Sequence, residues 1–140
     1  MRGGPPPAFI KEVLVNAATV PEIAARLTGE TSGVAVRLTS DRELHRLNRA
    51  YAGEDHATDV LSFAGDEAHL GDIAISWPAT ERQALEHGHP ETAELALLSV
   101  HGLLHLLGWD HATSEERREM TRLTRAALKV SGIRLASGRL

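Results

Sequence analysis

The sequence predicts an α+β protein in which a small mixed sheet is packed with helices around one central buried helix. Three observations support this fold class. Short apolar runs stand between turn residues or alternate with polar ones, which is typical of strands. Other segments start at a capping residue and carry apolar residues at helical spacing. Residues 90–107 are apolar on nearly every face from Leu95 onward, which is typical of a helix buried in the core.

The strands are predicted at the short apolar runs. Residues 33–39 alternate between turn residues, and residues 60–63 and 73–76 are short buried runs. Residues 12–15 are a weaker candidate for a further strand.

The helices are predicted from their start and stop signals. Serine caps, proline at a first helical position and glycine just past the last turn are such signals. Ser40 and Glu43 also have the spacing of a capping box. Helices are predicted at residues 21–27, from Asp41 to about Ala50, at 79–87 before Gly88, at 90–107 before Gly108, and after Ser114 as the last cap.

The composition is that of one globular domain without cysteine chemistry. The chain has 140 residues, 42% of them hydrophobic, so we expect one domain over residues 1–140, with the Gly/Pro-rich residues 1–8 as a flexible lead-in. The lack of cysteine excludes disulfides, a thiolate zinc site and a cysteine nucleophile. A transition-metal site must therefore use histidine and carboxylate, and eight histidines are present.

Charge and apolar patterning limit the partners. The formal net charge of −4 is unlike that of a protein that wraps bulk nucleic acid, although local basic patches are compatible with it. The longest charge-free run, residues 95–109, is shorter than the ~20 apolar residues that span a membrane. The first residues lack the apolar segment of a signal peptide. We expect a cytoplasmic protein without membrane association.

Three histidines near the end of the buried helix have the spacing of metal ligands. His101 and His105 lie one helical turn apart, which places their Cβ atoms about 5–6 Å from each other and suits two imidazoles on one Zn²⁺. Gly108 can adopt a positive φ, so the chain can turn and bring His111 back as a third ligand. Three histidines leave the fourth tetrahedral position for water, which is typical of a catalytic zinc site.

Two other interpretations of these histidines remain open. They could be hydrogen-bonded core residues, although two histidines on an apolar helix are costly to bury without partners. The same spacing also occurs in metzincin proteases, whose general base is the glutamate after the first histidine. Gly102 stands at that position, so a metallopeptidase is a minor alternative. The other histidines show no ligand spacing and are expected at the surface: His45, His56, His69, His87 and His89.

Residues 101–111, HGLLHLLGWDH, resemble the H-G-x-L-H-L-x-G-x-D-H signature of the YbeY endoribonucleases, the ribosomal RNA maturation factors of bacteria. Residues 58–63, TDVLSF, are similar to the family's T-D/N-V-L-S-F block, and residues 71–76, GDIAIS, to its G-D-I-x-I segment. The resemblance covers about residues 34–130, in order and with compatible gaps.

The resemblance implies a metal-dependent hydrolase that cuts single-stranded RNA, with roles in maturing small-subunit ribosomal RNA and in ribosome quality control. It also implies a mixed four-stranded sheet surrounded by helices. Carried over to this sequence, it makes His101, His105 and His111 the metal ligands. The implied partners are single-stranded RNA, ribosomal RNA and the small ribosomal subunit.

One position departs from the family. An arginine usually follows the aromatic residue that Tyr51 represents, and Ala52 stands there in this chain. The family arginine is thought to bind or stabilise the phosphate, so its loss bears on catalysis. We hypothesise that Arg49 or His56 supplies the missing positive charge, since each lies within four residues of Ala52.

The sequence leaves the general base unassigned. Zinc can activate water for attack on the phosphodiester, or the 2′-hydroxyl of the RNA can attack. Asp110 lies beside a ligand, and Glu94 lies two turns before His101 on the same helix face. Each is a candidate base or a carboxylate that orients an imidazole. A cap role for Asp110 and a solvated surface position for Glu94 are equally open.

Several residues are candidate RNA contacts. Arg42, Arg46 and Arg49 share one face of a predicted helix and suit phosphate binding, although a solvated face would show the same pattern. Thr58 and Ser62 could touch the RNA backbone, and hydrogen bonds within a turn or strand explain them as well.

A second class of function also stays open, a non-catalytic ribosome-binding factor whose metal is structural. Ala52 and the acidic net charge favour this alternative. The three-histidine site opposes it, because a structural zinc would need a fourth protein ligand.

Overall fold

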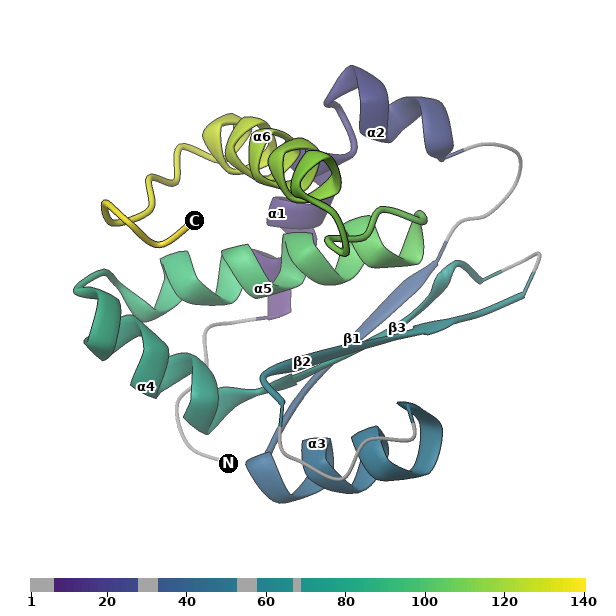
Figure 1. The fold of residues 1–140 in the computed structure, drawn as a ribbon, viewed down its shortest axis with the longest axis vertical. Helices are drawn as coiled ribbons and strands as arrows, with labels where there is room; N and C mark the ends of the chain where they lie inside the picture. Colours follow the sequence, from purple (N-terminus) through teal and green to yellow (C-terminus); the bar gives the residue numbers. More distant parts are fainter. Residues whose placement is uncertain (1–6, 28–32, 53–57, 67–68) are drawn as a thin grey trace.

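The computed structural model describes residues 7–27, 33–52, 58–66 and 69–140, which form an α+β fold (Figure 1). The predicted fold class is confirmed, and each predicted helix is found at or near its expected place. In chain order the elements are α1 (Pro7–Ala17), α2 (Pro21–Arg26), β1 (Val34–Thr39), α3 (Asp41–Leu47) with a π-helical turn after it (Asn48–Ala52), β2 (Val60–Ala64), β3 (Gly71–Ser76), α4 (Trp77–His87), α5 (Glu91–Leu106) and α6 (Ser114–Val130).

The described strands form a mixed sheet with β3 in the middle, in the order β1-β3-β2. β1 runs parallel to β3, with Val36 opposite Ile73, and β2 runs antiparallel to β3, with Ser62 opposite the same residue. β3 is buried along almost its whole length, as expected for a central strand that is covered on both faces. The three main predicted strands are confirmed.

The further strand predicted at residues 12–15 is wrong, because this segment belongs to α1. The buried residues Ile10, Val13 and Ala17 are spaced three and four positions apart, which places them on one face of a helix. A window of four residues is too short to show this period. The described part of the chain therefore holds three strands, rather than the four that the resemblance implies.

The buried helix α5 lies between the sheet and a layer that contains α1 and α6, whereas α3 covers the opposite face of the sheet (Figure 1). Eleven of its sixteen residues are buried. One apolar cluster joins α5 to α1 and α6, and a second joins it to β3. The predicted burial of this helix is confirmed. No helix formed by the described residues has the length and apolar character needed to cross a membrane.

Several helix starts differ from the prediction by one or two residues: α4 begins at Trp77 rather than Ala79, and α5 begins at Glu91 rather than Pro90. The cap of α6 is Thr113 rather than Ser114, because the Thr113 hydroxyl accepts a hydrogen bond from the backbone N–H of Glu116. The Glu116 carboxylate accepts one from the N–H of Thr113 in return, which completes a capping box. Pro7 and Ala8, expected in the flexible lead-in, already form the first turn of α1, where proline is well tolerated.

Candidate metal centre

His101 and His105 lie one turn apart near the C-terminal end of α5, and both are partly buried. Burial lowers the pKa of His101 to about 4, with a smaller contribution from the charge of His105. Burial also lowers the pKa of His105, and the neighbouring His111 adds to this. Both imidazoles are therefore neutral at pH 7, which is the form that binds a metal ion.

The turn after α5 fixes the ring of His105. Gly108 has a φ of 97°, the left-handed conformation that its position predicts, and the N–H of Trp109 donates to the carbonyl of Leu104 at 3.0 Å. The Trp109 carbonyl then accepts a hydrogen bond from Nδ1 of His105 at 3.0 Å. Because a carbonyl can only accept, Nδ1 carries the proton and Nε2 keeps its lone pair for a ligand.

Arg26 at the end of α2 holds this turn from outside. Its guanidinium carbon lies 3.6 Å from the ring centre of Trp109, a cation–π contact. Its Nη1 donates to the carbonyl of Leu107 at 3.1 Å. Sequence reasoning missed Arg26, because it lies 81 residues from Leu107 along the chain and no local pattern marks it.

His111 lies in the exposed loop after this turn. Its ring centre is 5.1 Å from that of His105, and the two rings meet edge to face at 80°. Oδ1 of Asp110 accepts a hydrogen bond from the backbone N–H of His111 at 2.8 Å. The structure thus shows the Asp110 carboxylate bound to the backbone of the loop, where it orders the residue that carries the His111 imidazole.

The three histidines gather near one end of α5 without forming a finished metal site. No three histidine or carboxylate side chains within the described ranges are arranged to hold a metal ion as they stand. The donor set nevertheless suits zinc: His101 and His105 are neutral, His105 has its Nε2 lone pair available, and His111 lies beside it. Ligation by these residues stays a prediction.

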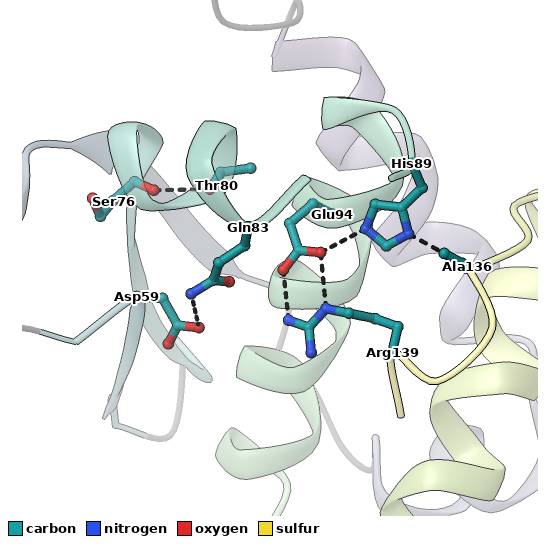
Figure 2. Close-up of polar contacts among 8 residues, drawn as sticks. All are labelled: Asp59, Ser76, Thr80, Gln83, His89, Glu94, Ala136 and Arg139. Carbon is teal, nitrogen blue, oxygen red and sulfur yellow. Dashed lines mark hydrogen bonds and ion pairs between the residues drawn. The ribbon is translucent and has the colours of Figure 1, made fainter. Parts of the chain in front are cut away.

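Glu94 is fully buried on α5, two turns before His101, and its carboxylate has three hydrogen-bond donors (Figure 2). They are Nε2 of His89 at 2.7 Å, and Nε and Nη2 of Arg139 at 3.0 and 2.6 Å. Burial by itself would raise the pKa of Glu94, but the hydrogen bonds from Arg139 and His89 outweigh it and lower the pKa. Of the roles left open for Glu94, the solvated surface position is wrong, and the imidazole that its carboxylate binds belongs to His89 rather than His101.

His89 is a second correction, since its side chain is only 4% exposed although a surface position was expected. Its Nδ1 accepts a hydrogen bond from the backbone N–H of Ala136 at 3.1 Å, so its Nε2 carries the proton donated to Glu94. Arg139 was not singled out from the sequence, because it lies 45 residues from Glu94 along the chain.

Asp59, just before β2, is a further carboxylate near the candidate metal centre. Its negative charge opposes the lowering of the His101 pKa, which places it within electrostatic reach of that ring. Its Oδ2 accepts a hydrogen bond from Nε2 of Gln83 on α4 at 3.2 Å (Figure 2). Its backbone carbonyl accepts one from the N–H of Ser76 at 2.9 Å. Asp59 therefore ties the start of β2 to β3 and α4.

The predicted arginine face on α3 and the turn after it is only partly available to RNA. Arg42 and Arg49 are exposed. Arg46 is exposed as well, but its Nε donates to the carboxylate of Glu43 at 2.9 Å, so part of its guanidinium is already paired. His56, the other candidate for the missing positive charge, lies outside the described residues.

The two hydroxyl side chains proposed as RNA contacts are both partly buried. Oγ of Ser62 donates to the carbonyl of Gly102 at 3.0 Å, which ties β2 to α5 beside His101. Thr58 lies just before β2. For Ser62 the hydrogen bond within the fold is therefore the role that the structure shows.

These observations define a class: an α+β protein whose buried helix presents candidate histidine ligands beside a mixed sheet. A model of the family Endoribonuclease YbeY matches residues 8–132, a range that includes His101, His105 and His111. The chain belongs to the YbeY endoribonuclease family.

Individual relatives agree with this assignment. The protein named endoribonuclease YbeY of Chloroflexus aurantiacus is 46% identical over 123 residues, which cover 78% of this chain and 80% of that protein. The one of Shouchella clausii is 42% identical over 128 residues, with 80% and 77% covered. A solution structure of a Thermotoga maritima protein is similar to this fold, with a TM-score of 0.63 and 26% identity over 93% of this chain and 86% of that one.

Proposed function

We propose that this protein is a zinc-dependent endoribonuclease that cleaves single-stranded RNA in the cytoplasm, in the maturation of small-subunit ribosomal RNA and in ribosome quality control. The family match over residues 8–132 carries this proposal, because it spans the whole histidine motif. The relatives named as endoribonucleases support cleavage of RNA. The proposed partners are ribosomal RNA and the small ribosomal subunit.

The chain's own residues supply the ligands and hold them ready. His101, His105 and His111 would hold one zinc ion. The ion would supply Lewis acidity, which polarises a phosphate oxygen and makes water a stronger acid. Burial keeps His101 neutral, and the carbonyl of Trp109 fixes the proton of His105 on Nδ1. Neither ring has to lose a proton at pH 7 before it binds the metal.

Gly102 argues against the metallopeptidase alternative. The metzincin mechanism places a glutamate at this position as the general base. A Cβ atom at Gly102 would lie 2.6 Å from Cγ2 of the buried Ile73, so the position has no room for a side chain.

The test is cleavage of an end-labelled single-stranded RNA by the zinc-loaded chain, by His111→Ala and by His87→Ala. Removal of a residue that only supports a ligand lowers metal affinity or activity about 10–100-fold. We therefore expect loss of the ligand His111 to slow cleavage by more than about 100-fold. His87→Ala, at the C-terminal end of α4, is the matched control and should cleave like the wild type. A cyclic phosphate on the product would show attack by the 2′-hydroxyl rather than by water.

Two other outcomes of this cleavage assay would contradict the proposed function. If the wild type binds one zinc ion but does not cleave RNA, the non-catalytic ribosome-binding factor replaces the nuclease. Equal cleavage by the wild type and His111→Ala would mean that the activity comes from a contaminating nuclease.

A further inference from the structure

The C-terminal segment of the chain lies beside the N-terminal part of α5 (Figure 1). We call residues 136–139 the C-terminal clasp, because Arg139 at one end binds Glu94 on α5 and Ala136 at the other end binds His89, just before α5. The family model ends at residue 132, so the clasp lies beyond the part of the chain that the family describes.

One buried carboxylate anchors the clasp. Glu94 is fully buried, and the Arg139 side chain that pairs with it is only 17% exposed. Arg139 binds both carboxylate oxygens through Nε and Nη2, whereas the N–H of Ala136 binds His89, which in turn donates to Glu94 (Figure 2). A buried carboxylate with this many donors is satisfied only while every partner stays in place.

The clasp also reaches toward the candidate metal centre. Glu94 and His101 are seven residues apart on α5, which is close to two full turns, so they lie on the same face of the helix. Arg139 binds Glu94 and is therefore attached to the helix face that carries His101.

We propose that the C-terminal clasp holds α5 through Glu94 and thereby positions His101 for metal binding, with Arg139 as the positioning residue. This inference rests on the proposed function, since it assumes that His101 is a ligand. It assigns to the end of the chain a part in the metal centre that the matched family region does not contain.

The test compares the zinc affinity of the full-length wild type with that of Arg139→Gln. Zinc binding is measured by competition with a chromogenic chelator, and circular dichroism confirms at the same temperature that each protein is folded. We expect Arg139→Gln to weaken zinc binding by about tenfold or more, the usual effect of losing a residue that orients a ligand. The control is Arg134→Gln, an exposed arginine of the same segment, which should bind zinc like the wild type.

A second variant separates positioning from simple instability. Arg139→Gln leaves the Glu94 carboxylate buried without its main partner, which destabilises a fold strongly. Glu94→Gln combined with Arg139→Gln leaves no such charge, so this double variant should fold better while the clasp is still weakened. If the folded double variant also binds zinc at least about tenfold more weakly than the wild type, the positioning role is supported. If the folded variants bind zinc within twofold of the wild type, the clasp is only structural and the inference is wrong.

The experiment distinguishes a wrong proposal about the clasp from a wrong proposal about the metal centre. A wild-type chain that binds no zinc would overturn the proposed metal centre, and the positioning role would fall with it. A wild-type chain that binds zinc and variants that bind it equally well would overturn the clasp alone. Arg139→Lys keeps the charge but loses the two-pronged geometry, so its zinc affinity should lie between those of the wild type and Arg139→Gln.

Discussion

Gly102 on α5 lies directly against Ile73 in the middle strand: a Cβ atom at Gly102 would be 2.6 Å from Cγ2 and 2.9 Å from Cδ1 of Ile73. Real Cβ atoms essentially never come this close to a neighbour. Ile73 is fully buried and cannot move into solvent. The missing side chain at Gly102 therefore allows α5 to approach the sheet closely enough to carry His101 beside it.

This contact predicts that Gly102→Ala destabilises the protein. Alanine favours a helix over glycine by about 1 kcal/mol, but overpacking a full core costs about 1–3 kcal/mol. The clash involves three atoms of Ile73, so we expect a net loss of up to about 2 kcal/mol in the free energy of unfolding, measured by urea denaturation.

A double-mutant cycle with Ile73→Ala isolates the contact. Ile73→Ala removes the three atoms that the new Cβ would meet, so the same Gly102→Ala change should become neutral or stabilising in that background. An equal loss of stability in both backgrounds would show that the cost does not come from the contact with Ile73.

The lowered pKa of His101 predicts a pH dependence of stability for the metal-free protein. The imidazole titrates at about 4 in the fold and at about 6.5 in the unfolded chain. Between these values the unfolded state binds more protons, so the contribution of His101 is fully present above pH 6.5 and is lost as the pH falls toward 4. The upper limit of this loss is about 3 kcal/mol.

Urea denaturation in the presence of a chelator, at pH 7 and pH 4.5, measures this effect. His101→Gln has no imidazole to protonate and should lose less stability than the wild type between the two pH values. His87→Gln should keep the wild-type difference. A difference between the two pH values that is equal in all three proteins would mean that other groups cause it.

The hydroxyl of Ser62 is predicted to act within the fold. It donates to the carbonyl of Gly102 at 3.0 Å and ties β2 to α5. Ser62→Ala should therefore lower the free energy of unfolding by about 1 kcal/mol and leave the Kd for single-stranded RNA within twofold of the wild type. Unchanged stability with a clearly weaker Kd would instead identify Ser62 as an RNA contact.

Local signals in the sequence were enough to predict the part of the site that lies within one helix and its turn. The separation of His101 and His105 by four residues predicts one helix face, and Gly108 at the end of an apolar run predicts the left-handed turn that follows. The start of α6 was misplaced by one residue, because Thr113 and Ser114 are both good capping residues and stand side by side.

The partners that come from distant segments could not be predicted. Glu94 binds Arg139 from the end of the chain, and Arg26 holds the turn around Trp109 from α2. An exposed arginine or glutamate looks the same in the sequence as a buried, paired one, because pairing depends on the tertiary fold. For this reason the sequence left a solvated surface position open for Glu94, which is fully buried in the structure.

The arginine face on α3 and the turn after it predicts how RNA binding depends on salt. Unpaired arginines should contact phosphate groups more strongly than one that is already bound to a carboxylate. Each phosphate contact to single-stranded RNA contributes about 0.7 to the slope of log affinity against log salt concentration. All three arginines are exposed, but only Arg46 is bound to Glu43. Arg42→Ala and Arg49→Ala should each reduce the slope by about 0.7, and Arg46→Ala should reduce it by less.

Fluorescence anisotropy with a labelled single-stranded RNA over a range of salt concentrations measures these slopes. Glu43→Gln is the informative companion, because it removes the carboxylate that holds Arg46 and Arg37. With Arg46 released, the slope should become steeper than that of the wild type, and Arg46→Ala in the Glu43→Gln background should lower it by about 0.7. Slopes that are equal in all of these proteins would show that RNA does not bind this face and that its arginines are simply solvated.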